Sequence, residues 1–116
     1  MNLLLFVYAG DCAEGMIHMV ENGVTQPVNL GSGDGVSIKE VAEAIRNNYN
    51  KEVGIEWDIT KPKGDARRLM DTTRAESHGF KCKTSLQDGI KETIQWFLNN
   101  KETYKKRNNY FTKGAK

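Results

Sequence analysis

The sequence predicts a small α/β domain of three main helices and a few short strands. Two stretches begin with a helix-capping pattern and continue with apolar residues at helical spacing, and a third stretch near the C-terminus carries the longest such stripe. Short apolar runs bounded by glycine lie between these stretches, as is typical of strands. At 116 residues the chain has the length of one domain with a modest core.

Composition and charge are those of an ordinary globular protein. The chain is 38% hydrophobic and 28% charged, and its net charge of +2 is too small to indicate nucleic-acid binding. Cys12 and Cys82 lie far apart in a chain without a secretory signal pattern, so we expect reduced thiols and a cytoplasmic protein. The apolar opening, Leu3 to Tyr8, is too short to span a membrane.

The opening run predicts a strand that is covered on both faces. Residues Leu3 to Tyr8 are apolar without alternation. Such a strand needs neighbours on both sides, and this chain offers few other strands. We therefore expect a truncated domain.

The first helix is predicted to begin at Asp11, which forms a capping box with Glu14, and to end at Asn22-Gly23. Its predicted inward residues are Cys12, Met16, Met19 and Val20. His18 lies at the edge of this face and is expected to be structural, since no second ligand lies at metal spacing.

The middle of the chain predicts strand, helix and strand. Val28–Leu30 forms the first strand, and Ser37 with Glu40 forms a second capping box. The helix that follows has as its predicted inward residues Ile38, Val41, Ala42 and Ile45. Residues Val53 to Asp58 are predicted to form the next strand, with Ile55 and Trp57 on one side.

The turn from Gly31 to Gly33 has a superficial likeness to a dinucleotide-binding turn. The third glycine of that motif, which allows close packing of helix and strand, is replaced by Val36. Asp34 would place a negative charge where the pyrophosphate should lie. We therefore interpret the segment as a tight turn and predict no cofactor-binding residue here.

The strongest candidate for a binding site is the basic stretch from Thr60 to Glu76. Arg67 and Arg68 follow a Gly-Asp turn, and Lys61 precedes it. A guanidinium donates two hydrogen bonds to a phosphate, so these three cations could bind phosphate oxygens. The alternative is a solvated basic loop.

The last third of the chain predicts a short helix from Arg74 to His78 and a connector from Phe80 to Thr84. A long helix then begins near Ser85 and ends near Asn99. Its predicted inward residues are Leu86, Ile90, Ile94, Phe97 and Leu98. Residues 101–116 are predicted to be a basic, frayed tail.

Nothing in the sequence supplies complete catalytic machinery. No serine or cysteine lies in a recognisable nucleophile motif, and the two histidines share no motif with a cysteine or an acid. No zinc-ligand spacing is present. We therefore predict no catalytic and no metal-binding residue.

Four segments, taken together, resemble the C-terminal third of the extended short-chain dehydrogenases/reductases that act on nucleoside-diphosphate sugars. The match covers about residues 5–100, in the order of the family. The segments are 6–13 (FVYAGDCA), 28–38 (VNLGSGDGVSI), 61–75 (KPKGDARRLMDTTRA) and 79–96 (GFKCKTSLQDGIKETIQW). The lead-in KPKG and the paired arginines resemble the GDP-fucose synthase type of epimerase/reductase.

The resemblance implies that residues 1–100 form a substrate-binding lobe without its Rossmann domain. In the family, NAD or NADP belongs to the preceding lobe, and this lobe closes over the nucleotide sugar. Arg67 falls where a family arginine contacts the sugar nucleotide, with Arg68 and Lys61 in support. The glycine-rich turn and the Tyr-x-x-x-Lys pair of the family are absent from this sequence, so the resemblance implies no turnover by this chain alone.

Three hypotheses follow from the resemblance. The first is a detached or truncated nucleotide-sugar-binding portion of an epimerase, dehydratase or epimerase/reductase. The second is a free-standing binding or assembly module that keeps the fold of the lobe. The third is a chain that completes an active enzyme with a separate Rossmann chain. In each case, the face that would meet the Rossmann lobe is expected to be bare and to favour self-association through the Leu3–Tyr8 strand or its neighbouring helices.

Overall fold

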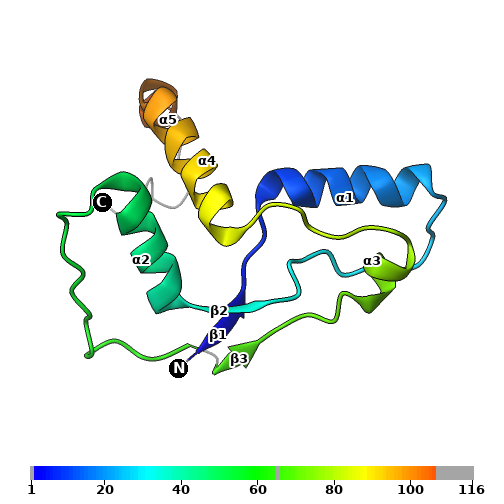
Figure 1. Cartoon of the computed structure of the whole chain (residues 1–116), viewed down its shortest axis with the longest axis horizontal. Helices are drawn as coiled ribbons and strands as arrows, with labels where there is room; N and C mark the ends of the chain where they lie inside the picture. The colour runs from blue at the N-terminus through cyan, green and yellow to red at the C-terminus, as the bar shows by residue number, and fades with distance from the viewer. Residues whose placement is uncertain (1, 65, 107–116) are drawn as a thin grey trace.

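A computed structural model describes residues 2–64 and 66–106 of the chain and confirms the predicted α/β class. The three main helices are α1, α2 and α4 (Figure 1). The elements, in chain order, are β1 (Leu3–Leu5), α1 (Ala9–Glu21), β2 (Gly35–Ser37), α2 (Ile38–Tyr49), β3 (Arg67–Arg68), α3 (Thr73–Ser77), α4 (Leu86–Asn99) and α5 (Lys101–Lys106). The predicted basic tail thus begins with α5, and its residues 107–116 lie outside the described part of the chain.

The sheet has three short strands in the order β2-β1-β3, with β1 in the centre. Strand β1 is antiparallel to β2, with Leu4 opposite Val36, and parallel to β3, with Leu4 opposite Arg68. The predicted strand from Leu3 to Tyr8 is therefore present only over its first three residues.

Two strand predictions were wrong, and each has a physical reason. Val28 and Leu30 pack against a hydrophobic cluster under α1 instead of joining a ladder. Residues Val53 to Asp58 have the alternation of a strand, but the described residues provide no strand that pairs with them. The two outer strands form instead at Gly35–Ser37 and at the arginine pair.

The cluster under α1 joins parts of the chain that are far apart in sequence. Met19, Ala75 and Phe80 form its buried centre. The ring of Phe80 lies so close to α1 that a Cβ atom added at Gly15 would be 2.9 Å from it. A side chain at this position would therefore push the ring away from the helix.

The predicted inward face of α1 was partly wrong. The buried residues of the helix are Asp11, Gly15 and Met19, whereas Met16 is 56% exposed and Val20 is 79% exposed. The hydrophobic stripe of α1 is thus turned partly toward solvent, because the cluster takes up the glycine-bearing side of the helix.

Local capping predictions were largely confirmed. Ser37 Oγ accepts from the backbone N–H of Glu40, and a carboxylate oxygen of Glu40 accepts from the backbone N–H of Ser37. Ser85 caps α4 through the N–H of Asp88. Gly79 has a φ of +83°, a left-handed conformation that suits glycine after a helix.

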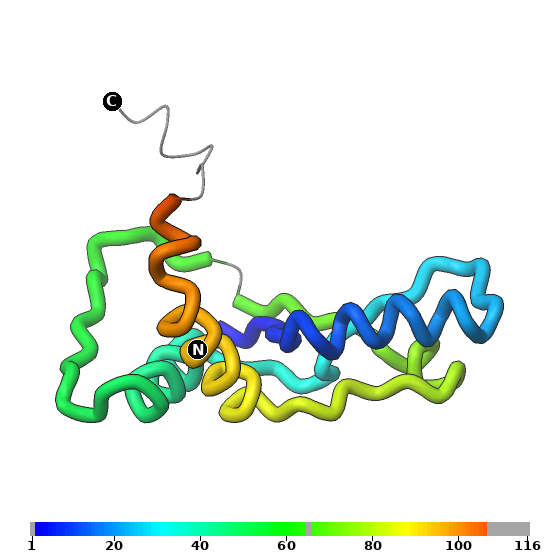
Figure 2. Tube along the Cα trace, turned by 90° about the horizontal axis from the view of Figure 1, so that it is seen from above, coloured from blue at the N-terminus to red at the C-terminus, as the bar shows by residue number. Residues whose placement is uncertain are grey.

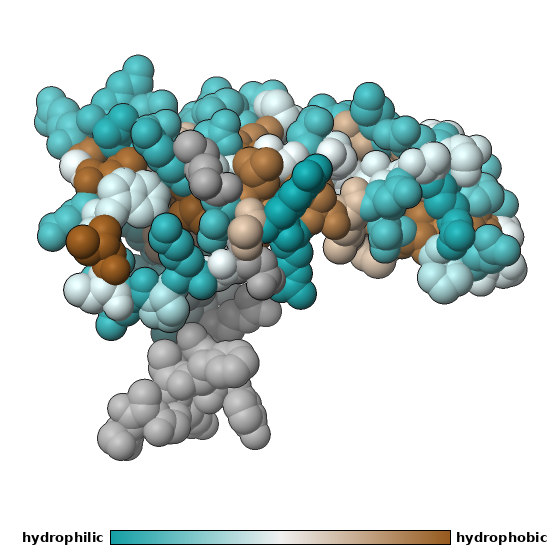
Figure 3. Space-filling model, turned by 90° about the horizontal axis from the view of Figure 1, so that it is seen from below, coloured by the Kyte–Doolittle hydropathy of each residue, from teal (hydrophilic) through white to brown (hydrophobic). Residues whose placement is uncertain are grey.

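The chain covers little of its apolar surface. Among the described residues, four hydrophobic side chains are buried, whereas fifteen large ones are exposed. The radius of gyration is 17.1 Å, compared with about 13 Å for a compact domain of this length. Figure 2 shows α1 extending to one side and α2, α4 and the 50–64 segment to the other, and Figure 3 shows brown apolar patches at the surface.

Candidate functional site

The predicted phosphate-binding arginines form strand β3, at one edge of the sheet. The backbone N–H of Leu3 donates to the carbonyl of Ala66 at 3.0 Å, and Asn2 Nδ2 donates to the carbonyl of Gly64 at 3.3 Å. Both arginines are exposed to solvent. The N-terminal strand thus fixes the backbone that carries the two guanidinium groups.

A turn at Asp71 fixes the other end of this segment. Asp71 Oδ1 accepts from the N–H of Thr73 at 2.9 Å and from its hydroxyl at 2.5 Å. These bonds favour the carboxylate and lower the pKa of Asp71 below its ordinary value of 3.8. Asn29 Nδ2 donates to the carbonyl of Asp71 at 3.2 Å, so Asn29 supports the segment.

The two arginines belong to different faces of the sheet. Successive side chains of a strand point to opposite faces, so Arg67 shares a face with Leu3 and Arg68 shares a face with Leu4. Among the described residues, the Arg67 guanidinium has no hydrogen-bond or ion-pair partner. A ligand bound to one face of the sheet would therefore contact the guanidinium group of only one of these two arginines.

Lys61, the third predicted cation, lies in the exposed loop before β3. Its backbone N–H donates to the carbonyl of Asp58 at 3.5 Å. No contact that joins Lys61 to the arginines is present in the described part of the chain. The structure therefore brings Arg67 and Arg68 together on one strand and leaves Lys61 apart.

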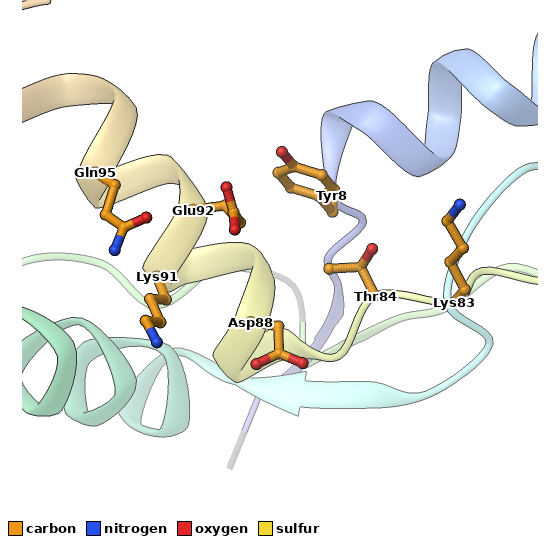
Figure 4. Close-up of a pocket in the computed structure, with 7 residues that line it drawn as sticks. All are labelled: Tyr8, Lys83, Thr84, Asp88, Lys91, Glu92 and Gln95. Atoms are coloured by element: carbon orange, nitrogen blue, oxygen red, sulfur yellow. The ribbon is translucent and has the colours of Figure 1, made fainter. Parts of the chain in front are cut away.

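A polar pocket of about 500 Å³ lies where α1 begins beside α4. Figure 4 shows Asp88, Lys91, Glu92 and Gln95 on α4, with Tyr8, Thr84 and Lys83 across from them. Lys83 Nζ lies 2.9 Å from a carboxylate oxygen of Glu14, and the hydrogen bond to Glu14 raises the pKa of Lys83. Lys83 is thus held in its charged form and is unsuited to act as a general base.

The most buried polar contact next to this pocket involves Asp11. Its side chain is 2% exposed, and its two oxygens accept from the N–H and the hydroxyl of Thr84, each at 2.9 Å. The prediction that Asp11 caps α1 was wrong, because Tyr8 is the N-cap residue and its side chain makes no capping bond. The carboxylate instead joins α1 to the turn before α4, a contact between residues too distant in sequence for a local pattern to indicate.

A further groove, of about 970 Å³, lies between α2 and α4. Its lining is mostly apolar and includes Phe6, Val36, Ile45, Ile90 and Phe97. Ile45 and Phe97, which were predicted to point inward, are 45% and 42% exposed. The helices α2 and α4 pack against each other, and these two side chains remain partly open to the groove beside their contact.

The N-terminus of α2 does not offer the anion site of a dinucleotide-binding turn. The backbone N–H of Ser37 already donates to a carboxylate oxygen of Glu40 at 2.7 Å. These bonds keep the pKa of Glu40 below its ordinary value of 4.5, so the carboxylate is charged at neutral pH. A pyrophosphate at this helix end would meet that negative charge.

The histidines and cysteines have structural surroundings. His18 Nε2 donates to the carbonyl of His78 at 2.7 Å, as expected for a structural histidine. Burial, together with the charges of Asp11 and Cys12, raises the pKa of the Cys82 thiol and disfavours a nucleophilic thiolate. In the described ranges, no group of histidine, cysteine and acidic side chains could hold a metal ion, and no helix is long and apolar enough to cross a membrane.

Comparison with known proteins finds relatives among the GDP-L-fucose synthases. The chain is 36% identical over 96 residues to GDP-L-fucose synthase 1 of Arabidopsis thaliana, covering 82% of this chain and 30% of that protein. It is 32% identical over 110 residues to GDP-L-fucose synthase of Escherichia coli K12, covering 86% and 34%. No protein-family model matches the chain.

A solved structure shares the fold. The UDP-glucose 4-epimerase of Bifidobacterium longum, determined in complex with NAD+ and UDP, superimposes with a TM-score of 0.73 at 21% identity. The match covers 86% of this chain and 31% of that protein. The chain thus spans about a third of the length of the proteins it matches.

Proposed function

The chain is related in sequence to the C-terminal portion of the extended short-chain dehydrogenases/reductases of the NDP-sugar epimerase type, and from this premise we propose that it is the nucleotide-sugar-binding portion of such an enzyme. The parent reaction is an NAD(P)-dependent epimerisation, dehydration or epimerisation with reduction. The observation that carries the proposal is the exposed, anchored arginine strand in a chain similar to GDP-L-fucose synthases.

Arg67 is the proposed principal contact to the diphosphate, with Arg68 and Lys61 as supporting cations. The backbone of β3 is fixed by its pairing with β1 and by the turn at Asp71, which follows it in the chain. Because the backbone is fixed, only the side chain of Arg67 has to be ordered when it binds a phosphate. Because Arg67 and Arg68 belong to different faces, we propose that Arg67 makes the hydrogen bonds to one phosphate group and that Arg68 and Lys61 contribute only their positive charge.

We propose that this chain has no turnover alone and that NAD(P) is held outside it. No Tyr-x-x-x-Lys pair and no Gly-x-x-Gly-x-x-Gly turn occurs among its residues. The carboxylate of Glu40 at the start of α2 supports the same conclusion, because it occupies the helix end that follows the glycine-rich turn from Gly31 to Gly35.

Thermal unfolding in the presence of UDP-, dTDP- and GDP-sugars tests the proposal. We expect at least one of these ligands to raise the melting temperature of the chain, with weak affinity because part of the site is missing. Arg67→Ala should weaken that binding about tenfold to 150-fold, the range for one charged hydrogen-bonded contact. Lys39→Ala, which removes one exposed positive charge on α2, is the matched control and should leave binding unchanged. If no nucleotide sugar stabilises the chain, the proposal is wrong.

The exposed apolar side chains favour a second candidate, a binding or assembly module that keeps this fold for another partner. That partner would be a separate Rossmann-type chain or a second copy that meets the β1 strand or its neighbouring helices. The thermal-unfolding panel distinguishes the two candidates. An assembly module should respond to none of the nucleotide sugars, whereas a binding lobe should be stabilised by at least one of them.

A further inference from the structure

The connector, residues 80–84, runs along the first turns of α1 on its way from α3 to α4 (Figure 1). At one end, the ring of Phe80 lies 2.9 Å from the position of a Cβ atom added at Gly15. At the other end, the N–H and the hydroxyl of Thr84 donate to the carboxylate of Asp11, each at 2.9 Å. The connector is therefore antiparallel to α1 and is held against it at two points.

Cys82 lies in the middle of the connector, on the side that faces the helix. Burial alternates along the connector, since Phe80, Cys82 and Thr84 are buried or partly buried and the two lysines between them are exposed. Cys82 Sγ donates to the carbonyl of Gly31 at 3.2 Å, and the side chain packs against the hydrophobic cluster under α1. These contacts hold the thiol on the α1 side of the connector.

Cys12 is the residue of α1 that is best placed to meet this thiol. It lies between the two helix positions, 11 and 15, that contact the ends of the connector. Of helix residues 12–14, Cys12 is partly buried and the other two are exposed. The charge of ionised Cys12 also helps to raise the pKa of Cys82, an effect that weakens with distance. The two thiols therefore lie in the same part of the interface between α1 and the connector.

We propose that Cys12 and Cys82 are a redox-responsive pair, which a small-molecule disulfide such as oxidised glutathione converts into a disulfide bond between α1 and the connector. Both cysteines are free thiols in the structure, and the sequence contains no others. A disulfide needs Cα atoms within about 7 Å of each other. The contacts of the neighbouring residues fix the two backbones side by side for this purpose.

The reaction is a pair of thiol–disulfide exchanges. The thiolate of Cys12 attacks one sulfur of oxidised glutathione, forms a mixed disulfide and releases one glutathione thiolate. Cys82 then loses its proton and attacks Sγ of Cys12, which forms the protein disulfide and releases the second glutathione. The two protein thiols lose two electrons and two protons, and the glutathione disulfide takes them up as two thiols.

Cys82 is suited to the second step rather than the first. Burial, together with the charges of Asp11 and Cys12, raises its pKa, so little of Cys82 is present as the thiolate that attacks a disulfide. In the second step, the disulfide under attack is attached to the same molecule. Its high effective concentration compensates for the small fraction of thiolate.

The disulfide would reinforce the joint that Asp11 and Thr84 already make. It closes a loop of about 70 residues, which lowers the entropy of the unfolded chain and stabilises the folded one. The hydrogen bond from Cys82 to the carbonyl of Gly31 is lost, since a disulfide sulfur has no proton to donate. The pair uses no residue of β3, so the proposal is independent of nucleotide-sugar binding.

Intact-mass measurement of the full 116-residue chain, equilibrated with reduced and oxidised glutathione, tests the proposal. We expect the main product to be a monomer that has lost two hydrogen atoms and carries no glutathione. In urea that unfolds the chain, the ratio of this product to the mixed disulfide should fall about tenfold or more, because only the fold brings the two thiols together. Mixed disulfides or linked dimers as the main product, no oxidation, or an equal ratio in urea would overturn the proposal.

Thermal unfolding of the oxidised chain tests whether the disulfide fits the native fold. Oxidation should raise the melting temperature by several degrees or more. Cys12→Ser and Cys82→Ser are the controls, since each keeps one thiol and can form only a mixed disulfide or a linked dimer. The same treatment should not raise their melting temperatures. A disulfide that lowers the melting temperature, or an equal rise in either variant, would contradict the placement of the pair.

Discussion

Replacing Asp11 with alanine should cost more stability than any other single removal of a carboxylate. The side chain is 2% exposed, and its oxygens accept from the N–H and the hydroxyl of Thr84. This contact joins the first turn of α1 to the turn that begins α4. Without it, the backbone N–H of Thr84 would have no acceptor in a partly buried position.

The expected loss follows from the two bonds. A hydrogen bond to a charged group contributes about 1.5–3 kcal/mol, so the pair sets an upper bound of about 3–6 kcal/mol. Removing the buried carboxylate also removes the cost of its desolvation, and this gain offsets part of the stability lost with the two hydrogen bonds. We expect Asp11→Ala to lower the free energy of unfolding by about 2–4 kcal/mol.

Urea denaturation measures this difference directly. Asp34→Ala is the matched control, because Asp34 is exposed, and it should change stability by less than about 0.5 kcal/mol. Hydrogen exchange at the Thr84 amide gives a local reading and should become faster in Asp11→Ala. If Asp11→Ala costs no more than Asp34→Ala, the inferred role of the contact is wrong.

Three further predictions concern local structure. Ser37→Ala removes the capping bond to Glu40 and should lower stability by about 1 kcal/mol in urea denaturation; an unchanged midpoint would contradict this role. Gly79→Ala should lower the free energy of unfolding by about 1 kcal/mol, because the φ of Gly79 is +83°. The control is Gly54→Ala, where an added Cβ has open space around it, and this change should be neutral or slightly stabilising. Equal effects of the two substitutions would contradict the role given to the backbone conformation of Gly79. The lowered pKa values of Glu40 and Asp71 contribute stability that is present above their ordinary values of 4.5 and 3.8 and lost as pH falls further. The free energy of unfolding, measured between pH 7 and pH 2, should therefore decline below about pH 4.5. A decline that begins near neutral pH would show that groups other than these two carboxylates cause it.

The predictions of helix capping succeeded where both partners of the capping bond lie close together in the sequence. The capping pairs at Ser37 and Ser85 join residues three apart, so the sequence contains both partners of each bond. The pattern at Asp11 was equally good, but Thr84 offers its carboxylate two donors. The capping pattern contains only nearby residues, so it cannot indicate that Thr84, which is distant in sequence, donates to Asp11 in the folded chain.

The strand errors have a related cause. Alternation at 53–59 correctly indicates an amphipathic extended segment, but a strand also needs a partner, and the described residues provide none. The arginine pair showed no alternation, yet it forms β3 because β1 lies beside it. That Arg67 and Arg68 belong to different faces follows only from this pairing.

The most direct test of the central claim is a titration of the isotopically labelled chain with GDP and UDP, followed by amide NMR shifts. The account predicts shifts that saturate with ligand and cluster on residues 61–64 and 66–68, and that are lost in Arg67→Ala. Shifts confined to the groove between α2 and α4, or none at millimolar nucleotide, would contradict the assignment of this chain as a nucleotide-sugar-binding lobe.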